Sequence, residues 1–187
     1  MLSSAIQVLT VAEAIRKRPQ MYFDLNNRLL ATHLVAECLC WVPVEAAVII
    51  ETQGFGMARV SWDLTFRDLA VSPHTGKPWA AGLLTSVPAP GPERAWETEL
   101  SCGGGWVIVN AACAQFDVLM RNADAEWGQR FVRGEPTTDF GIVDVGGEPS
   151  TIFEFELDGD FLPNVRIDNG WLKSWARTLP FRKCEVV

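Results

Sequence analysis

The residue types that build metal sites and disulfide frameworks are scarce in this sequence. It contains two histidines, His33 and His74, and five cysteines, an odd number with no pair in C-x-x-C spacing. Four-ligand zinc sites and disulfide frameworks need such clusters, so the sequence argues against both. We therefore expect no metal site and reduced thiols, with Cys38, Cys40 and Cys113 acting as small core fillers.

Positive charge and long apolar runs are also in short supply. The 187 residues include 16 Lys and Arg against 23 Asp and Glu, a net charge of −7 with a pI of about 4.8. An acidic surface repels a phosphate backbone, so we expect no direct nucleic-acid binding. No apolar run reaches bilayer-spanning length and no signal-peptide pattern opens the chain, which predicts a cytoplasmic protein without membrane contact.

The composition that is present favours a folded globular chain. Hydrophobic residues make up 48% of the sequence and charged residues 21%, which excludes disorder of the whole chain. The length fits one sizeable core, so we predict a single domain over residues 1–187. Proline and glycine concentrate between residues 72 and 100. We expect an irregular or disordered, lid-like segment there.

Periodicity and end signals predict a chain of alternating helices and strands. Helices are expected over residues 10–18, 28–41, 103–115 and 168–179. Strands are expected over 44–52 and 57–66 as a hairpin, over 116–121, 127–134 and 150–157 as an antiparallel meander, and over 184–187. Thr10 with Glu13 has the capping-box pattern, and Asp168 is the expected cap of the last helix. The order predicts an α+β fold, a two-layer sandwich with helices on one sheet face.

The segment HLVAECLCW, residues 33–41, places three chemically distinct side chains four residues apart. On a helix, His33, Glu37 and Trp41 share one face. A buried glutamate there can act as a general base, and an indole can stack on a planar ligand. The same face can equally have only a packing role. Glu37 is then a paired or solvated carboxylate, and Trp41 fills a cavity. His33 is the weakest catalytic candidate, because a satisfied helix histidine is the commoner case.

Four motifs follow one another along nearly the whole chain in the order of a known family. They are SSAIQVLTVAEAIRKRPQMYF, HLVAE, VIVNAACAQFDVLMR and STIFEFELDGDF. The first is similar to a V-L-x-x-x-x-A-V-R-K-R-P-x-M-Y-I pattern, which is long enough to be specific. Together they resemble the ATPase domain of the DNA gyrase B protein and of its topoisomerase IV counterpart, ParE. The resemblance implies the Bergerat (GHKL) ATPase fold, an eight-stranded mixed, mostly antiparallel sheet with helices on one face.

Departures from the family's catalytic pattern accompany this resemblance. The resemblance implies that Glu37 occupies the position of the general base that acts on the attacking water. Trp41 stands where an asparagine ligates magnesium, and an indole offers no oxygen ligand. Asp63, or Trp62 if the register slips by one residue, stands for the aspartate that binds the adenine amino group. Thr151 matches the family's threonine near the adenine.

The glycine-rich lid motif of the family, G-x-x-G-x-G, corresponds to SCGGGW in this chain. Gly103, Gly104 and Gly105 can form an anion-accepting nest, but the loop is too short to wrap three phosphates. ATP and magnesium are therefore not expected as cofactors. The basic run IRKRP is interpreted as a structural element that pairs with acids, with a phosphate site as the alternative. The resemblance also leads us to expect a stand-alone domain, without the family's N-terminal arm and further domains.

These departures favour a degenerate gyrase-B-like domain that has lost magnesium-dependent ATP hydrolysis. In this hypothesis the former nucleotide pocket binds a small molecule or nucleotide, in a binding, resistance or regulatory role. One alternative is a repurposed enzyme, in which Glu37 transfers protons on an aromatic or natural-product substrate. A second is a protein partner that mimics the gyrase domain and binds topoisomerase subunits. The sequence leaves the ligand and the oligomeric state open.

Overall fold

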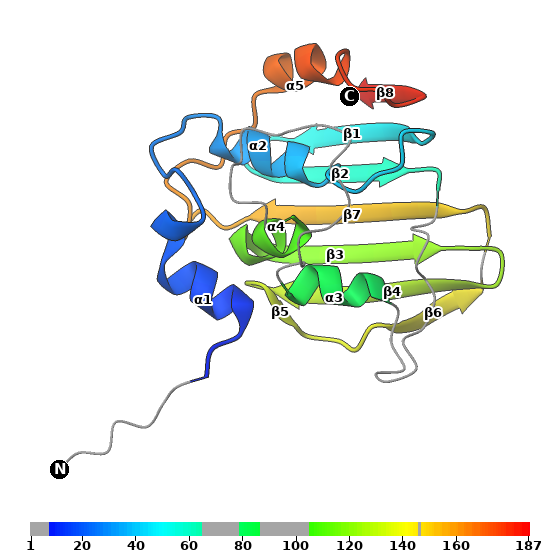
Figure 1. Cartoon of the computed structure of the whole chain (residues 1–187), viewed down its shortest axis with the longest axis horizontal. Coiled ribbons are helices and arrows are strands. Elements are labelled where there is room, and N and C mark those ends of the chain that lie inside the picture. The colour runs from blue at the N-terminus through cyan, green and yellow to red at the C-terminus, as the bar shows by residue number, and fades with distance from the viewer. Residues whose placement is uncertain (1–7, 65–78, 87–104, 146) are drawn as a thin grey trace.

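A computed structural model describes residues 8–64, 79–86, 105–145 and 147–187 of the chain. These residues build one mixed eight-stranded sheet with helices packed over one of its faces (Figure 1). The α+β two-layer sandwich expected from the sequence is thus confirmed. Within the described ranges, no helix is long and apolar enough to cross a membrane.

The sheet has the strand order β5-β4-β3-β7-β2-β1-β8, and β6 also pairs with β4. The strands are β1 (Ala47–Gln53), β2 (Met57–Trp62), β3 (Cys113–Arg121), β4 (Ala125–Val132), β5 (Glu135–Pro136), β6 (Gly141–Val145), β7 (Ser150–Leu157) and β8 (Lys183–Val186). The helices are α1 (Val11–Lys17), the short 3-10 helix η1 (Pro19–Met21), α2 (Leu30–Glu37), α3 (Trp79–Thr85), α4 (Trp106–Ala112) and α5 (Asn169–Ala176). Among these strands only β8 runs parallel to its neighbour β1, and the other pairs are antiparallel.

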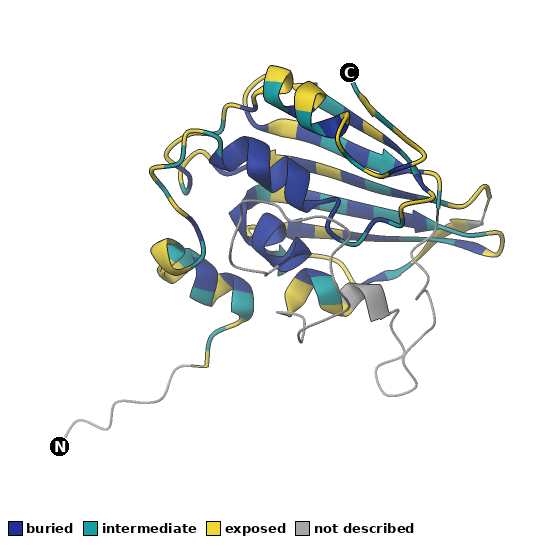
Figure 2. Cartoon of the chain, turned by 45° about the horizontal axis from the view of Figure 1, so that its top comes forward, coloured by how far each residue is buried: buried dark blue, intermediate teal, exposed yellow. Residues whose placement is uncertain are grey.

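Side-chain alternation along the strands separates a core face from an exposed face (Figure 2). In β7, Thr151, Phe153 and Phe155 are buried on the helix side, whereas Glu154 and Glu156 project from the other side. A period of two residues is what a strand needs to bury one face only. The core therefore lies between the helices and this one face of the sheet.

The capping box predicted at the first helix is confirmed. The Thr10 hydroxyl accepts the Glu13 N–H at 3.1 Å, and the Glu13 carboxylate accepts the Thr10 N–H at 2.9 Å. These two bonds satisfy backbone donors that the first helical turn leaves unpaired. The predicted cap of the last helix is confirmed as well, because the Asp168 carboxylate accepts the N–H of Trp171 at 2.9 Å.

In the basic run at the end of the first helix, Arg16 has the structural role predicted for the run. Arg16 pairs with buried Asp158 at 2.5 Å and donates to the carbonyl of Ala111 at 2.9 Å. Its guanidinium carbon lies 4.4 Å from the centre of the Phe161 ring. Burial on its own raises the pKa of Asp158, but the bond from Arg16 and the nearby charges outweigh it, so the pKa lies below its usual value. This ion pair ties α1 to the end of α4 and to the loop after β7.

The helix expected over residues 28–41 is shorter than predicted, which changes the position of Trp41. Regular helix ends at Glu37, and the next residues bond three positions back, as with Cys40 N–H to the Glu37 carbonyl at 3.1 Å. Such bonds tighten the turn, so the spacing of four no longer places side chains on one helical face. The expectation that His33, Glu37 and Trp41 share a helix face is therefore wrong for Trp41.

Two other expectations need correction. The strands β3, β4 and β7 do not form a meander, because β3 lies between the other two and pairs with both. β5 and β6, which the periodicity did not indicate, lie between β4 and β7 in the chain and pair with β4. The segment 72–100 is not irregular throughout, since Trp79–Thr85 forms α3. Residues 72–78 and 87–100 lie outside the described residues.

Candidate functional site

Glu37 is the candidate acid, and it lies buried at the last residue of α2 with 1% of its surface exposed. Its Oε1 atom accepts the backbone N–H of Gly105 at 3.1 Å. Gly105 is the residue directly before α4 and has φ +59° and ψ −143°. The carboxylate thus joins the end of α2 to the start of α4 inside the protein.

Trp41 packs onto the same glycine from another side. A Cβ atom at Gly105 would lie 2.6 Å and 2.7 Å from Cζ3 and Cζ2 of Trp41, and closer still to Cη2. Real Cβ atoms essentially never approach carbon so closely, so the indole occupies the space of a side chain at this position. Gly105 is consequently required both by its positive φ and by the ring against it. Glu37 and Trp41 together hold this glycine.

Beneath this contact lies a floor of buried aromatic rings. Trp106 is fully buried, and its indole N–H donates to the Cys38 carbonyl at 2.9 Å. Its ring centre lies 5.1 Å from that of Trp41 and 4.8 Å from that of Phe153, both edge to face. Trp62 completes the cluster, 5.2 Å from Phe153. Edge-to-face geometry is favourable for aromatic pairs, so these rings stabilise one another's positions.

Strand register decides which residue stands beside Thr151. Trp62 on β2 is directly opposite Thr151 on β7, and both are buried on the core face. The Thr151 hydroxyl donates to the carbonyl of Leu64 at 3.1 Å. An indole, not a carboxylate, therefore neighbours Thr151.

Asp63 occupies the next position and is exposed rather than facing the core. Its carboxylate accepts the N–H of Ala47 at 2.7 Å and pairs with Arg182. These contacts lie at the β1 side of the sheet. The structure therefore does not bring Asp63 together with Glu37 and Trp41.

The remaining candidates have other surroundings. His33 is buried, with Nδ1 3.3 Å from the Asn27 amide and its ring centre 5.0 Å from that of Trp171. It contacts the α5 side of the helix layer, whereas Glu37 contacts the residue that begins α4. Gly103 and Gly104 lie outside the described residues.

The buried thiols beside this site are not poised as nucleophiles. Burial raises the pKa of Cys38 well above its usual value, and neighbouring Cys113 and Glu37 add to the shift. Burial also raises the pKa of Cys113. Neutral thiols are weak nucleophiles and poor metal ligands. Together with buried Cys40, these two residues are core fillers, as predicted from the sequence.

The described residues do not fit a magnesium ion of the kind that the resemblance implies. Magnesium takes several oxygen ligands. Trp41 offers carbon atoms, and the Glu37 carboxylate bonds to a backbone amide. Within the described part of the chain, no three His, Cys, Asp or Glu side chains gather into a group that could hold a metal.

Sequence reasoning overlooked Trp106 and Phe153, the centre of the aromatic floor. A signal for Trp106 was present, because it directly follows the three glycines that correspond to the family's glycine-rich lid motif. Phe153 follows Thr151 by two residues and so shares its face of the strand. Neither position could be assigned to the site until the helices were placed on the sheet.

Sequence relatives of the chain are gyrase B proteins. No family model matches the chain. The DNA gyrase B protein of Halalkalibacterium halodurans is 27% identical over 192 residues, covering 95% of this chain and 30% of that protein. The DNA gyrase B protein of Staphylococcus aureus is 25% identical over 175 residues, covering 88% of this chain and 27% of that protein. The chain thus spans under a third of the length of these relatives.

A solved structure has the same fold. The topoisomerase IV ATP-binding domain of Francisella tularensis, in complex with a small-molecule inhibitor, matches with a TM-score of 0.70 and 19% identity. The match covers 90% of this chain and 83% of the other. The described part of the chain therefore shares its overall fold with that domain.

Proposed function

Because this chain is a gyrase-B-like domain with the GHKL fold, we propose that it does not hydrolyse ATP with magnesium and instead binds a planar small molecule or nucleotide base. The ligand lies against half-buried Trp41, which packs on the buried aromatic floor of the former nucleotide pocket. One observation carries this proposal: Gly105 is held between the Glu37 carboxylate and the Trp41 ring.

The contact of Glu37 argues against its use as a general base on water. A base must lie within hydrogen-bond reach of the proton that it removes. Glu37 is 1% exposed and accepts the amide of Gly105. That amide, at the start of α4, is also a donor that a phosphate would otherwise use. The same bond therefore occupies one oxygen of the candidate base and one phosphate donor, and phosphoryl transfer depends on both kinds of group.

The indoles support a planar ligand in place of a triphosphate. Trp41 is half-buried and so within reach of a ligand, while Trp106 below it is fully buried. Aromatic walls bind flat rings and supply no charge to neutralise phosphates. The Francisella tularensis domain binds a small-molecule inhibitor, which is consistent with small-molecule recognition by this fold.

Thermal-shift measurements with and without magnesium test the binding part of the proposal. The panel contains adenosine, ADP, ATP and an inhibitor of the topoisomerase IV ATP-binding domain. We expect at least one member to raise the melting temperature equally in magnesium and in EDTA. Trp41→Ala should abolish the shift, whereas Trp175→Ala removes a half-buried indole of α5 and should retain it. If no member of the panel changes the melting temperature, ligand binding is refuted.

A phosphate-release assay tests the loss of hydrolysis separately. The chain and its Glu37→Gln variant should both release phosphate at the background rate. Magnesium-dependent turnover that disappears in Glu37→Gln would overturn this part of the proposal, whatever the binding panel shows.

A further inference from the structure

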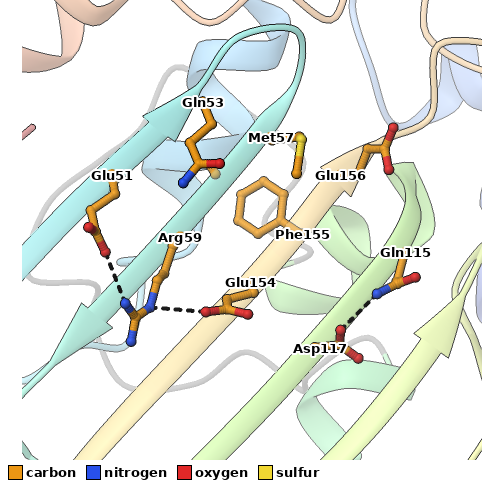
Figure 3. A pocket seen from close by; sticks show the side chains of 10 residues that line it. Glu51, Gln53, Met57, Arg59, Gln115, Asp117, Glu154, Phe155 and Glu156 are labelled. Atoms are coloured by element: carbon orange, nitrogen blue, oxygen red, sulfur yellow. Dashed lines mark hydrogen bonds and ion pairs between the residues drawn. The ribbon is translucent and has the colours of Figure 1, made fainter.

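The exposed face of the sheet, opposite the helices, carries a groove across β1, β2, β7 and β3 (Figure 3). Its volume is about 260 Å³. Strand register places Glu51, Arg59, Glu154 and Asp117 side by side across the four strands. In Figure 3 these side chains project from the strands into the groove, with the helices behind the sheet. The groove is thus separate from the site around Glu37.

Carboxylates outnumber bases in this row. Arg59 pairs with Glu51 at 3.3 Å and with Glu154 at 3.1 Å, so one guanidinium serves two acids. Asp117 pairs with Arg130 at 2.7 Å on its other side. Glu154 and Asp117 are direct cross-strand partners. Like charges opposite each other are destabilising, so a further cation between them is favourable.

The neighbouring row adds another acid and an apolar side chain. Gln53, Met57, Glu156 and Gln115 follow one another in register. Met57 is 46% exposed, and Glu156 has no ion-pair partner among the residues that the structure describes. This row can hold the apolar stem and the charged head of a long basic side chain.

A second, more apolar pocket of about 440 Å³ adjoins the groove and shares Asp117 and Glu154 with it. Leu119, Ile142 and Val143 supply its apolar lining. Ile142 is 65% exposed and Val143 57% exposed. The pair of carboxylates therefore lies between an acidic groove and an exposed apolar surface on the same face.

We propose that this face docks a basic segment of a partner protein that also carries apolar side chains. Lysine or arginine side chains lie between Glu154, Asp117 and Glu156, and apolar side chains cover Ile142 and Val143. Charge complementarity carries the choice of partner, because the two pockets hold five carboxylates and two guanidinium groups. This surface acts independently of any ligand at Trp41, since it lies on the opposite face of the sheet.

Fluorescence anisotropy tests the proposal with the full chain and a labelled peptide that alternates leucine with lysine and arginine. A peptide with glutamate in place of the basic residues is the negative control. Glu154→Gln/Glu156→Gln should weaken binding of the basic peptide about tenfold, as expected for two ion pairs. Glu45→Gln/Glu148→Gln changes the net charge equally at exposed positions outside both pockets and should leave binding unchanged.

The apolar half of the face is tested by Ile142→Thr. This variant should weaken binding of the leucine-containing peptide about threefold. Binding of a peptide with serine in place of leucine should be unaffected. The proposal is overturned if the basic peptide does not bind, or if both double variants weaken it equally. It is also overturned if the chain self-associates by light scattering and Ile142→Thr abolishes this, because the occupant is then a second copy.

Discussion

Gly105→Ala is the substitution that most directly tests the contact on which the proposed function depends. The φ of +59° with ψ −143° belongs to a region that side chains avoid, and such strain costs about 1–3 kcal/mol. The new methyl group would also displace the Trp41 ring, because a Cβ there lies within 2.7 Å of two ring carbons. Forcing a packed side chain to move costs about 1–3 kcal/mol more. We therefore expect a loss of about 3 kcal/mol in the free energy of unfolding.

A double-mutant cycle separates the two causes. With Trp41→Ala as the background, the ring is gone, and Gly105→Ala should cost only the backbone strain. The coupling free energy between the two sites should then be about 1–3 kcal/mol. For a chain of this size, the single variant should lower the melting temperature by about 6–12 °C.

Urea unfolding followed by circular dichroism is the suitable assay, because tryptophan fluorescence changes when Trp41 is removed. Gly159→Ala is the matched control, since a Cβ at that position meets no atom within 4 Å. It should change stability by less than about 0.5 kcal/mol. Additive effects of Trp41→Ala and Gly105→Ala, within about 0.5 kcal/mol, would show that the ring does not occupy this space. The support for a modified pocket would then be lost.

Three further predictions concern the rest of the core. Asp158→Asn removes the charge that pairs with Arg16 and Arg133 and should cost about 2–3 kcal/mol in urea unfolding, whereas Asp160→Asn changes a side chain that is 88% exposed and should cost little. Because the folded-state pKa of Asp158 is lowered, its contribution is present at neutral pH and is lost as the pH falls below about 4; the stability difference between wild type and Asp158→Asn should shrink there. Gly134 has φ +85°, and a Cβ there would lie 2.5 Å from the Cβ of Ala12, so Gly134→Ala should lower the melting temperature in thermal unfolding. Cys38 and Cys113 are fully buried and have raised pKa values, so both should stay unlabelled by maleimide at neutral pH in peptide mapping of the native protein; labelling of either would contradict their burial.

Local features of the chain could be predicted from the sequence because each depends on residues close to one another. The capping box at Thr10, the cap at Asp168 and the alternation of Thr151–Leu157 need only a few neighbours to define them. The α+β fold followed from the order of these elements and from four motifs spaced along the chain. The motif alone also indicated Glu37 as a candidate acid.

The arrangement of the site was decided only by tertiary structure. After Glu37 the backbone N–H groups bond to carbonyls three residues back instead of four. Trp41 therefore lies outside the regular helix and packs against Gly105. The pairing of β2 with β7 placed Trp62, and not Asp63, beside Thr151. A shift of one residue reverses the face to which a strand side chain points, and periodicity within one strand cannot set the register with another.

The exposed groove is the clearest case of a feature absent from local sequence. Glu51, Arg59, Asp117 and Glu154 lie far apart in the chain and become neighbours because four strands align in register. Local periodicity determined that each of these side chains lies on a polar strand face. The strand order, with β3 between β4 and β7, determined which charges meet, because contacts between strands depend on pairing across the whole fold.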